Sequence, residues 1–522
     1  MREGFLIGGG LIVAGLLLEL SVGPVVWKAF AWPANGIVLA GFLAIIFLLF
    51  ILGKFQFSIF NFQFNYAFSF IGTYQAAVPA MVYAVVPTII MGLTRQQING
   101  TWLNNMLSFW PFVLIYTYID VILGVIILRR IHNSQFTIHN LRRDVPFLLN
   151  HLGLFIALTT ATLGNADMQR VKMICGVGQP EWRAFDKDGA VKEMPIAIEL
   201  KKFIMETYDN GSPKRFASEI QILTKTGKRS TSGRFDTSKN IETTVDVNKP
   251  YEVDGWKIYQ YGYDTQMGAQ SQISILELVR DPWLPWVYAG FYMMLAGAVV
   301  MTLMVLWHRL RTATRKALWG YLALAVFASL FAYFFFDSYN TKTLVPALQS
   351  PWFAPHVFVY IFAYCLLGIA VIIVIYSQIR KNSQFSILNS QLNDLVYVGL
   401  AFLTIGMLFG ALWAKEAWGH YWSWDPKETW AAITWLAYLV YIHYRLTIKA
   451  NGQWTMHNAQ CTMQNVPLGP SGRLPQQECS TANRLAFWML IGSFVLLQMC
   501  WWGINYLPSA QGSSVHTYST RE

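Results

Sequence analysis

Tryptophan is concentrated in one short stretch of the sequence. Six indoles lie within residues 413–435, and the densest part reads WGHYWSWDPKETW over residues 418–430. Isolated Trp residues belong to the ordinary aromatic belt of a membrane protein, but six within 23 residues exceed what a belt requires. Indoles stack on flat ligands and donate N–H groups to carboxylates. The stretch therefore predicts a site for a flat apolar ligand with charged edges, contacted by Trp418, Trp422, Trp424, Asp425, Lys427, Glu428, Trp430 and Trp435.

The charged residues of this stretch suit different roles. Lys427 can pair with an anionic edge of the ligand. Asp425 and Glu428 are better placed to stabilise the loop, through local hydrogen bonds or helix N-terminal contacts. Pro426 between them is typical of the first turn of a helix, where carboxylates are favoured.

The rest of the chain indicates a membrane protein. Of 522 residues, 54% are hydrophobic and only 13% are charged, whereas soluble domains carry about 25% charged residues. A span needs about 20 apolar residues. About eleven runs approach this length, and we predict a polytopic α-helical membrane protein with spans near 4–22, 36–52, 76–93, 107–128, 145–163, 284–307, 319–336, 356–375, 395–413, 429–443 and 485–507.

Basic residues predict the orientation of these spans. Clusters such as Arg129–Arg130, Arg309–Arg315 and Arg380–Lys381 fall in alternate loops, so all of them can be cytoplasmic. The N-terminus is then cytoplasmic, and the C-terminus and the Trp-rich stretch are extracytoplasmic. The net charge of +11 follows from this topology and is not evidence for a nucleic-acid partner.

One long polar stretch interrupts the spans and predicts one extracytoplasmic β-rich domain at residues 164–282. Segments such as 256–261 and 273–278 alternate apolar and polar residues as strands do. Residues 196–208 fit one amphipathic helix. The predicted domains are therefore N-terminal transmembrane helices (1–163), the β-rich domain, and C-terminal transmembrane helices with the Trp-rich stretch (283–522).

The Trp-rich stretch closely resembles the "WWD" segment of the haem-handling proteins of cytochrome c biogenesis, and in particular the CcsA branch of the system II cytochrome c synthetase. Residues 347–357, 438–443 and 515–518 resemble this family's histidine-bearing segments, with Thr517 where Ser is usual. Residues 109–112, 151–154, 256–260 and 281–282 resemble the ResB/CcsB partner. The chain thus resembles a natural fusion of both proteins.

Four histidines are candidate axial ligands of haem iron, which a bis-His site binds from opposite ring faces. His356 and His516 are expected outside, flanking the Trp-rich stretch, and the resemblance implies that they form an external haem site. His151 and His443 lie at similar depth near the cytoplasmic side, and the resemblance implies a second, membrane-embedded site. The alternatives are hydrogen-bonding interfacial histidines for the first pair and snorkelling or helix-capping ones for the second. His420 matches no family ligand.

The resemblance implies a cytochrome c synthase of the haem lyase type in the bacterial inner membrane. Haem b would be both substrate and axially ligated group, and would be moved outward and joined by thioether bonds to the CxxCH motif of an apocytochrome c. The sequence has five Cys residues and no CxxC pair, so separate thiol-disulfide reductants are expected to keep CxxCH reduced. Membrane lipid is the other expected partner.

Two other classes of function fit some of these features. A membrane b-type cytochrome that transfers electrons would explain the histidines but not the tryptophans. A haem exporter or delivery protein without ligase activity would explain the tryptophans but would form no covalent product. Transporters often show inverted repeats and broken helices, which are not evident in the sequence.

Overall fold

The computed structural model describes residues 1–54, 58–59, 62–63, 68–96, 101–134, 138–224, 240–380, 385–450, 475–507 and 509–510. Nine helices in this part of the chain are long and apolar enough to cross a membrane, which confirms the polytopic helical fold. With two further long helices, α8 and α11, the bounds are α1 (Arg2–Val22), α2 (Ala34–Lys54), α4 (Tyr74–Leu93), α5 (Trp110–Asn133), α6 (Ile138–Gly164), α7 (Leu284–Thr312), α8 (Arg315–Thr341), α9 (Phe353–Arg380), α10 (Phe385–Trp418), α11 (Pro426–Ala450) and α12 (Pro475–Trp501).

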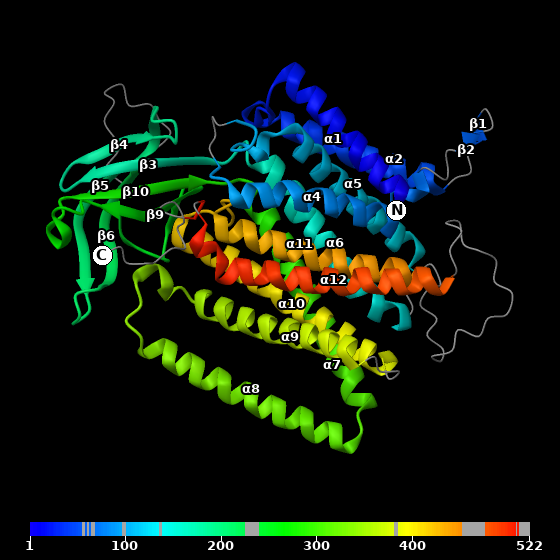
Figure 1. The fold of residues 1–522 in the computed structure, drawn as a ribbon. Helices are drawn as coiled ribbons and strands as arrows, with labels where there is room; N and C mark the ends of the chain where they lie inside the picture. The colour runs from blue at the N-terminus through cyan, green and yellow to red at the C-terminus, as the bar shows by residue number, and fades with distance from the viewer. Residues whose placement is uncertain are drawn as a thin grey trace.

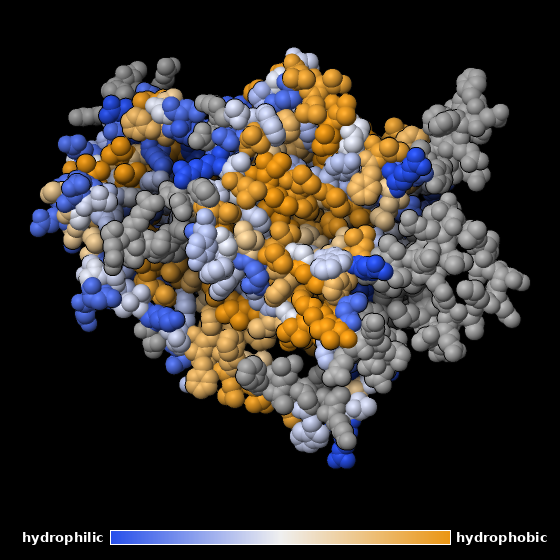
Figure 2. All heavy atoms as spheres, viewed as in Figure 1, coloured by the Kyte–Doolittle hydropathy of each residue, from blue (hydrophilic) through white to orange (hydrophobic). Residues whose placement is uncertain are grey.

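Helices from the two ends of the chain pack together in one bundle (Figure 1). α6 packs along α7, and α4 packs along α11. Gly153 and Gly290 let α6 and α7 approach closely, because a Cβ at either position would lie within 2.9 Å of the other helix's backbone. Small residues at such crossings are typical of membrane helices. Apolar side chains cover much of the bundle, while polar ones gather on the sheet (Figure 2).

The β-rich domain sits at one end of the bundle (Figure 1). Eight antiparallel strands form one sheet in the order β7-β6-β5-β4-β3-β10-β9-β8. Their bounds are β3 (Gln169–Gly176), β4 (Pro180–Phe185), β5 (Val191–Thr207), β6 (Pro213–Thr224), β7 (Asn240–Asp246), β8 (Tyr251–Val253), β9 (Trp256–Tyr263) and β10 (Ile273–Arg280). The inner face buries alternate residues such as Ile196, Ile198 and Leu278. The first strand follows α6 and the last precedes α7, so both ends of the domain are anchored in the bundle.

The predicted amphipathic helix at 196–208 is wrong, because residues 196–207 belong to strand β5 and Tyr208 directly follows it. Ile196, Ile198 and Leu200 are fully buried in the core of the β-rich domain, and Ala197 between the first two is buried as well. The register with β6 then shifts between Leu200 and Lys202. This bulge brings apolar residues back at 203–205 and makes the spacing resemble a helical period. The hydrogen-bonded pairing of β5 with β6 therefore determines the structure of this segment, and the helix-like spacing of its apolar residues does not.

Basic side chains mark the end of the bundle opposite the β-rich domain. α5 ends with Arg129 and Arg130, and α7 ends with Arg309 and Arg311. Arg130 pairs with Asp144 at 2.5 Å, and Arg309 pairs with Asp394. The N-terminus also lies at this end (Figure 1). The asymmetry has the pattern by which cytoplasmic loops collect Arg and Lys.

Candidate haem site

The rings of His151 and His443 lie close together within the bundle, in a T-shaped arrangement. His151 is on α6 and His443 on α11, so each end of the chain provides one ring. The ring centroids are 6.4 Å apart and the ring planes meet at 69°. Two imidazoles bound to one metal ion hold their nitrogens about 2 Å from it, or about 4 Å from each other. Each ring centroid lies beyond its nitrogen, so the distance between centroids must exceed the distance between nitrogens. The observed 6.4 Å is of the size that two rings sharing one metal ion require.

Each of the two rings is held by its own hydrogen bond, and the two bonds are of the same kind. Nδ1 of His151 lies 2.9 Å from the carbonyl oxygen of Phe147, and Nδ1 of His443 lies 2.8 Å from that of Leu439. A carbonyl only accepts, so Nδ1 carries the proton and donates. Nε2 then keeps its lone pair. Metal-binding histidines are commonly held in this tautomer by a carbonyl or carboxylate.

His356 shows the same arrangement at the other end of the bundle. It lies in the first turn of α9, and its Nδ1 donates to the carbonyl oxygen of Gly406 on α10 at 2.7 Å. Gly410 makes room for the ring, because a Cβ there would lie 2.8 Å from Cε1 of His356. His516, its predicted partner, lies outside the described residues.

The Trp-rich loop connects α10 to α11 beside the β-rich domain. Gly419 has φ +75° where α10 ends, and Trp424 has φ +57° just before α11 begins. Asp425 accepts from the backbone N–H of Lys427 at 2.9 Å. Glu428 accepts from the N–H groups of Ser423 and Asp425, at 2.7 and 3.2 Å. This reciprocal pattern is a capping box. Both carboxylates therefore make the local bonds expected of them.

The six indoles do not form one continuous surface. Trp418 lies 4.9 Å from Trp413, which lies 5.9 Å from the ring of His356. Trp422 and Trp424 form a second pair at 5.7 Å. The first pair lies at the end of α10 beside His356, and the second pair lies in the loop itself.

The last two indoles pack between helices. Trp430 is only 4% exposed, and its Nε1 donates to the carbonyl oxygen of Gly92 on α4 at 3.2 Å. Nε1 of Trp435 donates to Thr404 on α10 at 2.9 Å. The N–H groups of both are thus bonded to protein acceptors. Nε1 of Trp422 differs, because it is buried and has no acceptor among the described residues.

Sequence reasoning missed two features of the helix bundle. Asp120 on α5 is 4% exposed and accepts from Thr159 on α6 at 2.7 Å. A carboxyl group within an apolar run was the available signal, because ionisable residues in spans are rare. Gly410 gave no such signal, because its role depends on a ring from another helix.

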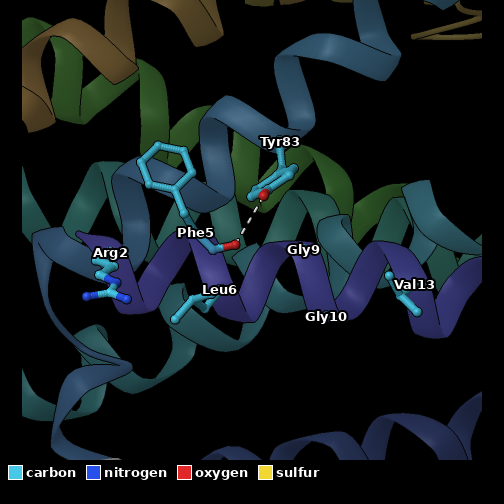
Figure 3. Close-up of a pocket in the computed structure, with 7 residues that line it drawn as sticks. All are labelled: Arg2, Phe5, Leu6, Gly9, Gly10, Val13 and Tyr83. Atoms are coloured by element: carbon cyan, nitrogen blue, oxygen red, sulfur yellow. Dashed lines mark hydrogen bonds between the residues drawn. The ribbon is translucent and has the colours of Figure 1, made fainter.

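A groove is lined by Arg2, Phe5, Leu6, Gly9, Gly10, Val13 and Tyr83 (Figure 3). It follows the outer face of α1, where Tyr83 donates to the carbonyl oxygen of Phe5 at 3.1 Å. None of the predicted haem contacts lines it. We assign it no part in the candidate site.

Two protein families match separate parts of the chain. The ResB-like family matches residues 141–275, which include most of α6 and nearly all of the β-rich domain. The cytochrome C assembly protein family matches residues 286–470, which include most of α7, all of α8 to α11 and the Trp-rich loop. The chain thus joins a ResB-like part to a part that matches the cytochrome C assembly protein family. The ResB-like half thus provides His151, and the CcsA-like half provides His356 and His443.

Relatives of the CcsA-like half are named cytochrome c biogenesis protein CcsA. The protein of Chlamydomonas reinhardtii is 47% identical over 124 residues, 22% of this chain and 35% of that protein. Those of Guillardia theta and Mesostigma viride are 34% and 31% identical over 35% and 37% of this chain, and 58% and 64% of their own lengths. This chain therefore matches between about a third and two thirds of each relative. The printed names of all three relatives refer to cytochrome c biogenesis.

Proposed function

We propose that this fusion is a cytochrome c synthase of the haem lyase type. It binds haem b at His151 and His443, passes it toward the β-rich domain, and attaches it to apocytochrome c at the Trp-rich loop. The observation that carries the proposal is the His151–His443 pair, with rings 6.4 Å apart and both Nδ1 atoms held by backbone carbonyls. The pair joins the two halves, so neither half alone provides both ligands.

One further observation fits haem as the substrate. Nε1 of Trp422 is buried without an acceptor among the described residues, and an orphaned donor gains free energy from an acceptor such as a propionate oxygen. The porphyrin itself provides four equatorial ligands, so a histidine pair is sufficient to complete the coordination of its iron.

The external site would hold the substrate between the Trp-rich loop and two histidines. His356 would be one axial ligand and His516 the other, with Trp418, Trp422 and Trp424 against the macrocycle and Lys427 near an anionic edge. Asp425, Glu428, Trp430 and Trp435 would act by shaping the loop and the start of α11. Each thiol of a reduced CxxCH motif would then add across one vinyl group, with sulfur bonding to one carbon and hydrogen to the other. The protein supplies orientation for this addition.

The proposal includes an orientation and separate partners. The Arg-rich end of the bundle and the N-terminus would face the bacterial cytoplasm, and the β-rich domain the outside. The sequence has no CxxC pair, so thiol-disulfide reductants for CxxCH would be separate proteins.

Co-expression with an apocytochrome c tests the proposal, in a host without its own haem attachment system. We expect a product whose mass includes haem and whose haem resists acid–acetone extraction. Haem bound to the membrane protein without a covalent product would favour delivery alone. Rapid haem reduction by quinol without a product would favour a b-type cytochrome.

Gly410 provides a test of the His356 site that leaves the histidine in place. Gly410→Ala puts a Cβ 2.8 Å from Cε1 of His356, so the ring must move or lose its bond to Gly406. We expect roughly 10-fold less covalent product, since loss of an outer partner of a metal-binding His costs 10- to 100-fold. Gly10→Ala is the matched control, because nothing lies within 4 Å of a Cβ there. Equal product from both variants would remove His356 from the account.

A further inference from the structure

The β-rich domain contacts the start of the Trp-rich loop through a half-buried ion pair. Arg170 on β3 donates from Nε and Nη2 to the two carboxylate oxygens of Glu277 on β10, at 2.7 and 2.9 Å. The same Nη2 donates to the backbone carbonyl oxygen of Trp418 at 3.3 Å. The carboxylate of Glu277 is almost completely buried. A bidentate pair of this kind fixes the guanidinium in position, and the guanidinium in turn fixes the end of α10.

The loop backbone is shaped to fit against the domain. Gly419 has φ +75°, a conformation that residues with a Cβ rarely adopt. A Cβ there would also lie 3.1 Å from Val279 on β10 and 3.2 Å from Tyr259 on β9. On the helix side, Nζ of the buried Lys415 on α10 donates to the carbonyl oxygen of Gly419 at 3.0 Å. Gly419 is therefore held between two strands and the helix that precedes it.

Two indoles connect the end of α10, which Arg170 contacts, to the ring of His356. Trp418 lies 4.9 Å from Trp413, and Trp413 lies 5.9 Å from His356. Nε1 of Trp413 donates to the carbonyl oxygen of Ala347 at 2.8 Å, in the segment that leads into α9. Asn248 of the β-rich domain binds the carbonyl oxygen of Pro346 in the same segment at 2.7 Å. The domain thus contacts the surroundings of His356 from two directions.

We propose that the β-rich domain is the positioning element of the external site, and that Arg170 is its positioning residue. Arg170 acts through Trp418 and touches no substrate. The ResB-like half would then contribute to haem attachment by holding the loop of the CcsA-like half. The effect on haem rests on the proposed function, whereas the effect on the loop does not.

Amide hydrogen exchange of residues 413–424 in the full-length protein tests the positioning directly. Arg170→Gln removes the bond to Trp418 but leaves the carboxylate of Glu277 buried and unpaired. The double variant Arg170→Gln with Glu277→Gln also removes that charge. We expect exchange about 10-fold faster than wild type in both, since a hydrogen bond from a charged group is lost in both. Arg215→Gln is the matched control, because Arg215 makes a bidentate pair with Asp246 in the same sheet.

The haem spectrum and the reduction potential of the bound iron are the second readout. Both should shift in the single and double Arg170 variants and stay at wild-type values in Arg215→Gln. Wild-type exchange in the double variant would overturn the proposal, because the effect of the single variant would then come from the unpaired Glu277. If exchange rises but wild type binds no haem, the positioning role stands and the proposed function fails.

Discussion

His443→Ala is expected to purify with at least about 100-fold weaker haem binding at the membrane site. Removing an outer partner of a metal-binding histidine costs 10- to 100-fold in affinity, so removing the ligand should cost more. His151→Ala should give the same loss, because the two rings, whose centroids lie 6.4 Å apart, would bind the same iron. Titration of haem into the detergent-purified variants, followed by absorbance, measures the change.

His308→Ala is the control for this pair, since that ring is exposed at the far end of α7. All variants should reach the membrane at wild-type levels. If either single variant of the pair kept wild-type affinity, one shared iron between the two rings would be excluded.

His356→Ala should instead separate haem binding from haem attachment. The His151–His443 pair lies on other helices and keeps its carbonyl hydrogen bonds, so haem should still copurify. Covalent product should fall about 100-fold or more, because the external iron loses an axial ligand. The measurement is the ratio of covalent cytochrome to copurified haem upon co-expression with an apocytochrome. A fall in both quantities together would mean that His356 serves the membrane site or the fold.

Helices of this protein could be predicted well from apolar runs, because lipid-facing segments must be apolar along their length. The ends of those helices were less predictable. α11 extends from Pro426 to Ala450, beyond the predicted 429–443, because the capping box begins it earlier and polar residues continue it past His443. Strand β5 was mistaken for a helix because its bulge interrupts the alternation of period two.

The candidate site was predictable in its residue types but not in its arrangement. His151 and His443 could be paired from their depth in the membrane, and the structure brings their rings together. The division of the indoles could not be predicted, since Trp430 and Trp435 are bonded to α4 and α10 by contacts distant in sequence. Arg170 was likewise unpredictable, because it meets Trp418 only through the fold of the β-rich domain.

An electron-microscopy map of the haem-loaded protein measures most directly whether the Trp-rich loop holds the substrate. The account predicts one porphyrin against Trp418 and Trp422, with its iron bound by Nε2 of His356 on one face and by His516 on the other. Iron density away from the loop, or a His516 that does not reach the iron bound by His356, would contradict it.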